Sequence, residues 1–323
     1  KYEETNKSVF ASSNYNLGKL SINTGLRLES TNTVGRSNLI DSTVQRQYTQ
    51  IFPSFSADWM LDDQNTIYLS YSKRIQRPDY WRLNPFQMYV TPNYFITGNP
   101  FLSPAIPHSF NIGYAFKNYN FSLYYRSNRN KFTNVSIQDY NSSVTKDIQL
   151  NVGSSYSYGI DFFSTNKVFN KIELSNFVLF EKRREKTNVL DRLFKMDYYR
   201  VYFQVSATVN IWKDGRLKAE VAGNYSSPVY HGFYKVNSMS NASVGVKYSA
   251  FNGKTTFSLS MNDIFYTDNY RLDVDFSDQR NGFSERAETR LFSFSIRQNF
   301  GKNKMPFKKS EIEKSEESKR LKL

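Results

Sequence analysis

The sequence predicts an all-β protein: an antiparallel transmembrane β-barrel with short turns at one end and long loops at the other. Three observations predict it. Apolar and polar residues alternate with a period of two, and short and long links alternate between the predicted strands. Aromatic residues make up 17% of the 323 residues, although the mean hydropathy is only −0.61. Because disordered chains are poor in aromatics, this composition indicates a folded protein whose apolar side chains cover one face of each strand.

Period-two alternation indicates about thirteen strands, because successive side chains of a strand point to opposite faces. The pattern is clearest in 199–211, where every odd position from Tyr199 to Ile211 is apolar or aromatic and the positions between are polar or Tyr. The predicted strands are 5–15, 19–30, 47–61, 65–74, 108–117, 119–137, 146–168, 171–185, 194–212, 216–227, 238–251, 255–265 and 287–300.

Two kinds of link alternate between these strands. The short ones carry Gly, Asn or Asp, which tolerate the positive φ of tight hairpin turns, and they lie at 17–19, 62–64, 117–118, 170–171, 213–215 and 252–254. The long ones lie at about 31–46, 75–107, 138–145, 186–193, 228–237 and 266–286. Outer-membrane barrels have this arrangement, with short periplasmic turns and long extracellular loops. Because an odd number of antiparallel strands cannot close, we expect at least one further strand upstream.

A soluble β-sandwich also alternates, so it is the main alternative fold. Sandwiches need Greek-key crossings, whereas these strands are joined as nearest-neighbour hairpins. Trp59, Phe116, Tyr119 and Trp212 lie beside the short turns, where an interfacial aromatic girdle belongs. A sheet in lipid has to close, because every backbone donor there must be paired. We therefore predict that residues 1–300 form part of a membrane barrel.

The most specific segment follows the fourth predicted strand. It contains the runs Tyr71-Ser72-Lys73-Arg74-Ile75-Gln76-Arg77-Pro78, Leu83-Asn84-Pro85-Phe86 and Gly98-Asn99-Pro100-Phe101-Leu102-Ser103-Pro104. Arg74 and Arg77 lie where the strand leaves the membrane, and Pro78 and Pro85 end the strand pairing because they lack an N–H donor. The Asn-Pro and Gly-Asn-Pro runs favour fixed turns.

This segment resembles the TonB-dependent receptors, and in particular the outer membrane protein beta-barrel family of Bacteroidota-type receptors. The matching positions are Tyr71, Arg74, Ile75, Arg77, Pro78, Leu83, Asn84, Pro85, Phe86, Gly98, Asn99, Pro100, Leu102 and Pro104. Ala105 departs from the family pattern, which usually has an acidic or polar residue there. The resemblance implies a 22-stranded barrel with an N-terminal plug, of which this chain would be the C-terminal barrel portion.

Two interpretations of the segment remain open. It is either a structural loop that folds over the barrel mouth, or it also lines a ligand site. The structural role would belong to the motif residues Tyr71, Arg74, Arg77, Pro78, Asn84, Pro85, Gly98, Asn99, Pro100 and Pro104. The ligand role would belong to aromatic side chains, which bury a large area at low entropic cost. The candidates are Tyr80, Trp81, Phe86, Tyr89, Tyr94 and Phe95.

The net charge and the scarcity of Cys and His reduce the number of function classes to consider. The 43 Lys and Arg exceed the 29 Asp and Glu by 14, but a barrel beside an anionic outer leaflet carries cationic loops, so nucleic acid is not required. Residues 301–323 are rich in Lys and Glu and are expected to form a disordered periplasmic tail. With no Cys and only the distant His108 and His231, we expect no metal site, no cofactor and no enzyme activity.

The leading hypothesis is a TonB-dependent receptor-like transporter in the bacterial outer membrane, which imports a ligand captured by its extracellular loops. Its partners would be outer-membrane lipid, a TonB-type energising protein acting through an upstream plug, and a surface lipoprotein. The alternatives are a non-transporting barrel with a structural, adhesive or assembly role, and a soluble all-β binding module. The sequence does not identify the substrate.

Overall fold

The computed structural model describes residues 2–37, 42–139, 141–189, 192–212, 214–231, 234–276 and 279–300. A single antiparallel path of thirteen strands dominates it, and all thirteen predicted strands are present. In spatial order they are β1 (Tyr2–Leu17), β2 (Leu20–Ser37), β3 (Ser42–Asp62), β4 (Asn65–Lys73), β7 (Ile106–Phe116), β8 (Tyr119–Asp139), β9 (Val144–Val168), β10 (Ile172–Val189), β11 (Arg192–Asn210), β12 (Leu217–Ser226), β15 (Met239–Ala250), β16 (Thr255–Met261) and β19 (Phe292–Gln298).

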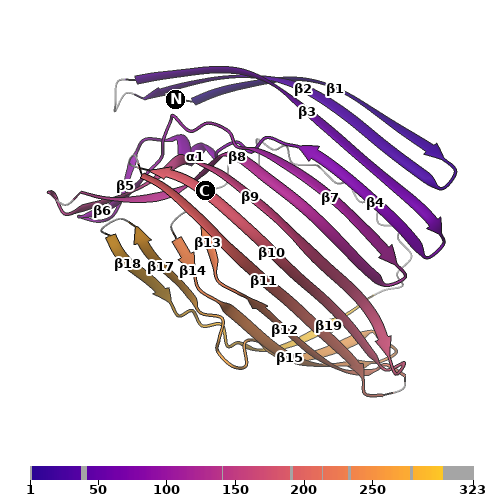
Figure 1. Ribbon diagram of the computed structural model, residues 1–323. Coiled ribbons are helices and arrows are strands. Elements are labelled where there is room, and N and C mark those ends of the chain that lie inside the picture. The colour runs from indigo at the N-terminus through magenta and orange to yellow at the C-terminus, as the bar shows by residue number, and fades with distance from the viewer. Residues whose placement is uncertain are drawn as a thin grey trace.

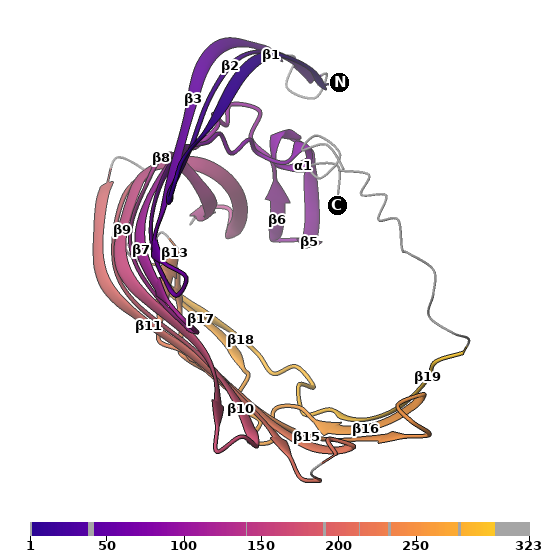
Figure 2. The same ribbon diagram turned by 90° about the vertical axis from the view of Figure 1, so that its right-hand side faces the viewer.

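Each strand of this path pairs with the strand that precedes it along the path, so the sheet is built from nearest-neighbour hairpins, as predicted. The β1–β2 hairpin runs without a slip from the pair Leu17 and Leu20 at the short turn to the pair Tyr2 and Gly35. Figure 2 shows the sheet as an open arc, with β1 at one end and β19 at the other. In the described residues, β1 and β19 do not pair with each other.

The two faces of the arc differ in polarity. On β11 the expected division is confirmed: Phe203 and Val205 are 44% and 38% exposed, whereas Tyr198 on the other face is 8% exposed. The polar face is the concave one, because Glu29 on that face contacts Arg77 of a segment that lies inside the arc (Figure 2). Apolar side chains therefore cover the convex face, as the sequence predicted for a membrane barrel.

Two of the six expected long loops are mainly strand, so the predicted strand ends there were wrong. The links at 31–46 and 186–193 are the far ends of the β2–β3 and β10–β11 hairpins, whereas the link at 138–145 lies between strand ends at Asp139 and Val144, within two residues of those predicted. These ends are polar on both faces, because they lie beyond the apolar band. A pattern that relies on apolar alternation does not detect such strands.

The other three long links contain short elements of their own. Between β4 and β7 lie α1 (Tyr80–Leu83), β5 (Gln87–Thr91) and β6 (Tyr94–Thr97), and β6 pairs in parallel with β9. The remaining two links supply a second sheet of four strands, β13 (Val229–His231), β14 (Tyr234–Val236), β17 (Tyr270–Phe276) and β18 (Gln279–Glu285). In the described part of the chain, no helix has the length and hydropathy of a membrane span.

Two tyrosines on the concave face bridge over glycines of the neighbouring strand. Tyr68 of β4 lies over Gly113 of β7, and Tyr124 of β8 lies over Gly159 of β9. A Cβ at Gly159 would be only 2.7 Å from the Tyr124 hydroxyl oxygen, so the ring needs the space that glycine leaves. Each hydroxyl donates a 2.8 Å hydrogen bond one strand further on, to Asn120 Oδ1 and to Glu181 Oε2 respectively.

Candidate functional site at the long-loop end

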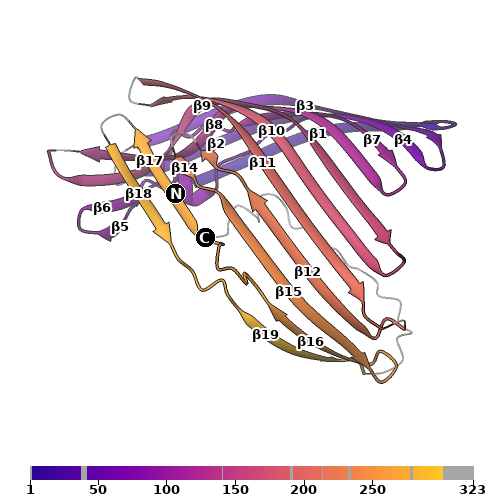
Figure 3. The ribbon, with the colours of Figure 1, turned by 60° about the horizontal axis from the view of Figure 1, so that its bottom comes forward.

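The short elements gather at one end of the sheet. Figures 1 and 3 show β5, β6, β14, β17 and β18 at the end opposite the short turns. The second sheet packs against the far end of the β8–β9 hairpin through a small apolar core, in which Val135 is 0% and Val274 5% exposed. Ile137, Leu150, Tyr234 and Leu272 pack around this pair. The long-loop end is therefore a folded cap with a core of its own.

The motif segment begins as a continuation of β4. The Tyr71 ring lies 4.4 Å from that of Phe110, and the Arg74 N–H donates to the Pro107 carbonyl at 2.9 Å. Gln76 and Ala105 then exchange two backbone hydrogen bonds of 2.9 Å. Ala105 is 1% exposed, so this departure from the family pattern is a tightly packed position where a small side chain fits.

Arg77 fastens the segment to the first hairpin. Its guanidinium forms an ion pair with Glu29, lies 3.6 Å from Glu4, and donates a 3.1 Å hydrogen bond to Thr31 Oγ1. The three charged side chains are between 5% and 7% exposed. Arg27, which is 40% exposed, also lies 3.6 Å from Glu29, so the two buried carboxylates balance the two cations and leave no excess positive charge. Arg77 therefore serves to position the segment. The next residue, Pro78, is buried where the chain turns away from the strand.

Gly98 is the point where the second half of the segment crosses the first. Its N–H donates to the Asn84 carbonyl at 2.9 Å, and the next N–H, of Asn99, donates to the Arg82 carbonyl at 2.6 Å. A Cβ on Gly98 would lie 2.6 Å from the Arg82 carbonyl oxygen and closer still to that of Asn84. Only glycine therefore allows the two backbones to approach in this way.

Replacing Gly98 by alanine should therefore open this crossing. Because both opposing atoms belong to the backbone, the chain has to shift, and we expect the cap to lose about 1–3 kcal/mol. Hydrogen exchange of the amides in 75–105 measures this loss. Gly35→Ala is the matched control, because its Cβ would meet nothing closer than 3.5 Å. Equal protection in the two variants would contradict this account of Gly98.

The Gly-Asn-Pro run ties the segment to β9. Asn99 Nδ2 donates to the Gln149 carbonyl at 3.0 Å, and Asn99 Oδ1 accepts the Phe101 N–H at 2.9 Å. Two residues before Ala105, the N–H and carbonyl of Ser103 both bond the Asn151 side chain, at 2.8 and 2.9 Å. The prolines Pro85, Pro100 and Pro104 are partly buried along this path.

The six aromatic candidates divide into two groups. Trp81, Phe86 and Tyr89 are 39%, 63% and 61% exposed. Phe95 is buried at 8%, and the Tyr94 hydroxyl donates to Asp147 at 2.7 Å. The remaining candidate, Tyr80, is partly buried, and its ring packs against that of Tyr2 in a tilted arrangement with the ring centres 5.5 Å apart. A ligand-contacting lining is therefore proposed for the three exposed side chains alone.

A buried carboxylate, missed by sequence analysis, joins the parts of the cap. Asp147 of β9 accepts hydrogen bonds from Tyr94 of β6 and from Asn134 and Ser136 of β8. The Ser136 hydroxyl also contacts the Tyr234 hydroxyl of the second sheet at 2.9 Å. Burial and the bond to Asp147 raise the pKa of Tyr94, and burial raises the pKa of Tyr234. Both phenols are therefore neutral donors at physiological pH.

Below the cap, the concave face carries paired charges. Glu181 is 1% exposed and lies 3.0 Å from Arg183. Glu185 is 2% exposed and forms an ion pair with Lys131, with 2.7 Å between the ammonium nitrogen and the carboxylate oxygen. In the cap above them, burial and the nearby Lys131 charge lower the pKa of His231. In the described ranges, no group of three His, Asp or Glu side chains is arranged to hold a metal ion.

Comparison with known proteins identifies the class of this fold. Residues 1–297 match the model of the outer membrane protein beta-barrel family. The chain belongs to that family, and its location is the outer membrane, as the sequence predicted. No curated protein matches the chain.

Three solved structures with this fold are of transporters and a receptor. The copper transporter OprC has a TM-score of 0.65 and 14% identity over 91% of this chain and 48% of its own. The FrpB iron transporter of Neisseria meningitidis (F5-1 variant) has a TM-score of 0.61 and 13% identity, over 91% of this chain and 45% of its own. The ferric-catecholate import receptor Fiu of E. coli K12 has a TM-score of 0.60 and 13% identity, over 93% of this chain and 45% of its own. This chain therefore spans about half the length of these proteins.

Proposed function

We propose that this chain is the barrel portion of a TonB-dependent importer, and that its cap captures the ligand. The observation that carries the proposal is the exposure of Trp81, Phe86 and Tyr89 on a segment that is otherwise firmly fastened. Aromatic side chains held on a rigid support lose little entropy on binding, which is why they dominate recognition sites. This chain shares its fold with solved iron and copper transporters, and this similarity supports the same proposal.

Import across the outer membrane needs energy from elsewhere, because this membrane holds neither ATP nor an ion gradient. The proposed mechanism is therefore capture of the ligand by the cap, followed by displacement of an upstream plug by a TonB-type protein. A surface lipoprotein is a further proposed partner. The lumen wall beneath the cap fits a passage for polar solutes, since its charges are paired and its face is polar.

Uptake measurements separate this proposal from a non-transporting barrel. A strain without the full-length gene and a complemented strain are given iron chelates, copper, oligosaccharides and peptides, with and without a protonophore. We expect one class of compound to accumulate only when the gene is present and the proton gradient is intact. A structural, adhesive or assembly barrel predicts equal accumulation in both strains for every compound, and that result would contradict import.

The double variant Phe86→Ala and Tyr89→Ala tests the role of the cap. If each side chain contributes about 1.4 kcal/mol to capture, half-maximal uptake should need on the order of 100-fold more ligand. The matched control is Phe169→Ala, since Phe169 is 86% exposed but lies at the β9–β10 turn at the opposite end. Unchanged uptake in the double variant, with normal surface levels, would remove the cap aromatics from the ligand site.

A further inference from the structure

A groove of about 520 Å³ lies on the convex, lipid-facing side of the sheet and has no part in the proposed import. Its floor is apolar and crosses five strands, with Leu69, Ile112, Leu123, Ile160 and Phe180 directly opposite one another in the register. These side chains are between 43% and 54% exposed, so the floor is open to the membrane. Its apolar composition fits a hydrocarbon chain.

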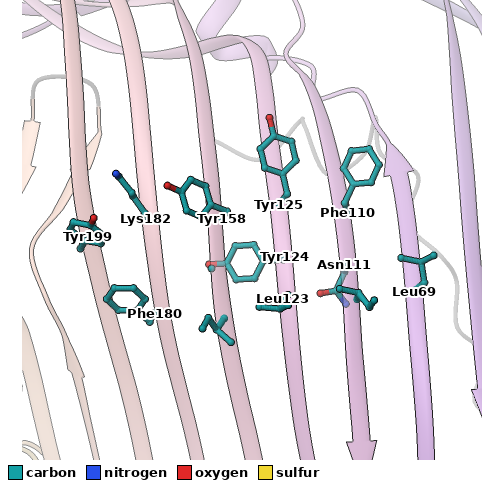
Figure 4. A pocket seen from close by; sticks show the side chains of 13 residues that line it. Leu69, Phe110, Asn111, Leu123, Tyr124, Tyr125, Tyr158, Phe180, Lys182 and Tyr199 are labelled. Atoms are coloured by element: carbon teal, nitrogen blue, oxygen red, sulfur yellow. The ribbon is translucent and has the colours of Figure 1, made fainter.

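One end of the groove is polar. Figure 4 shows Tyr125, Tyr158 and Lys182 at that end, with Leu123 and Phe180 towards the other. Lys182 lies directly between Tyr158 and Tyr199 in the register, and its ammonium group is 5.3 Å from the Tyr199 ring. The Lys182 ammonium group is thus held between aromatic side chains at the polar end of the apolar groove.

The depth of Lys182 places this polar end at the outer surface of the membrane. It follows Ile172, the first residue of β10 after a short turn, by ten residues. A membrane-crossing strand takes about 9–11 residues. The floor residue Phe180 lies two residues deeper on the same face, within the hydrocarbon. The groove therefore lies at the boundary between the lipid head groups and the acyl region, with its polar side outermost.

Lys182 and the tyrosines around it have unused binding capacity. Within the described ranges, no carboxylate forms an ion pair with Lys182, and the hydroxyls of Tyr125, Tyr158 and Tyr199 have no hydrogen-bond partner in the protein. The next cation outward on β10 differs, because Arg184 forms two hydrogen bonds of 2.7 and 2.9 Å with Asp197. In the described ranges, Lys182 therefore places a positive charge without an ion pair at the head of the groove.

We propose that this groove binds a phosphate-bearing lipid of the outer leaflet, with one acyl chain on the apolar floor and a head-group phosphate at Lys182. Charge complementarity favours an anionic lipid over a neutral one, because no carboxylate in the described ranges forms an ion pair with Lys182, and the nearby Asp197 is already bonded to Arg184. The tyrosine hydroxyls supply further donors to the same phosphate. An uncharged lipid would bury the same floor but would leave these polar groups without partners.

Native mass spectrometry of the purified full-length protein tests this proposal. The delipidated protein is mixed with a phosphorylated lipid A, with its dephosphorylated counterpart and with phosphatidylethanolamine. Loss of one cation–phosphate contact near a membrane surface is worth about fivefold in affinity. We therefore expect Lys182→Gln to bind phosphorylated lipid A about fivefold more weakly and to bind the dephosphorylated lipid as the unchanged protein does.

Lys186→Gln is the matched control, because Lys186 lies on the same face of β10 but four residues beyond the groove. If the two variants lose equal affinity, the attraction is diffuse and the site is refuted. Ile160→Trp fills the floor and should weaken both lipid A forms, and unchanged binding in this variant would also overturn the proposal. Heat-modifiable migration on gels verifies that each variant is folded.

Discussion

Replacing Arg77 by alanine should cost about 3–5 kcal/mol, the largest single effect that we expect in the cap. The substitution leaves Glu4 and Glu29, with side chains 5% and 7% exposed, as buried carboxylates without their shared cation, and Glu29 keeps only the more distant and more exposed Arg27 at 3.6 Å. Removing one partner of a buried ion pair is costly, because the remaining charge has lost both water and its counter-ion. The segment that carries the exposed aromatics should then detach from the first hairpin.

Denaturant unfolding of the full-length protein in lipid vesicles measures the cost. Arg74→Ala is the matched control, because Arg74 belongs to the same motif but is exposed and uses its backbone N–H in the fold. Adding Glu29→Gln to Arg77→Ala should recover part of the loss, since it removes one of the uncompensated charges. A loss in Arg77→Ala no larger than that in Arg74→Ala would refute the fastening role.

Placing an arginine on the lipid face, in Val205→Arg, should cost about 2–4 kcal/mol. Val205 is 38% exposed on the convex face, and it lies five residues from Asn210, the last residue of β11 at the short-turn end. Half of a membrane-crossing strand therefore separates it from the surface, so the charge would lie near the middle of the hydrocarbon.

The neighbouring substitution Ser206→Arg provides the control. Ser206 lies on the polar, concave face, where a guanidinium remains in contact with water, and the change should stay within about 0.5 kcal/mol. The same unfolding experiment in vesicles compares the two variants. Equal losses would mean that the convex face is not the one that contacts lipid.

The strand order was predictable from the sequence because each pairing is local. Alternation such as that from Tyr199 to Ile211 marks a strand with one apolar face, and a short turn after it leaves an antiparallel hairpin as the simplest connection. The ends of the strands were not predictable on this basis. Beyond the membrane both faces are wet, so residues such as those in 31–37 lack an apolar stripe although they pair without interruption.

The cap could be predicted only in part, because its contacts join loops that are far apart in the sequence. The motif prolines and glycines indicated fixed turns, and Gly98 and Asn99 indeed lie where backbones cross. Asp147 and Tyr234 showed no local signal, since a polar residue within a polar strand end is unremarkable until its partners are known. Exposure of the aromatic candidates likewise depended on packing, which separates Phe95 from Phe86.

The tyrosines that lie over glycines have a consequence for how the wall responds to force. Long antiparallel strands slide most easily by two residues, because that step keeps every side chain on its own face. For β9, such a step would bring Ser157 or Asp161 to the position of Gly159, where a Cβ would collide with the Tyr124 ring. Tyr68 blocks the same movement of β7 through Gly113. Each of these tyrosines thus opposes the sliding of one strand past its neighbour. Loops attached to these strands can therefore be pulled without changing the strand register.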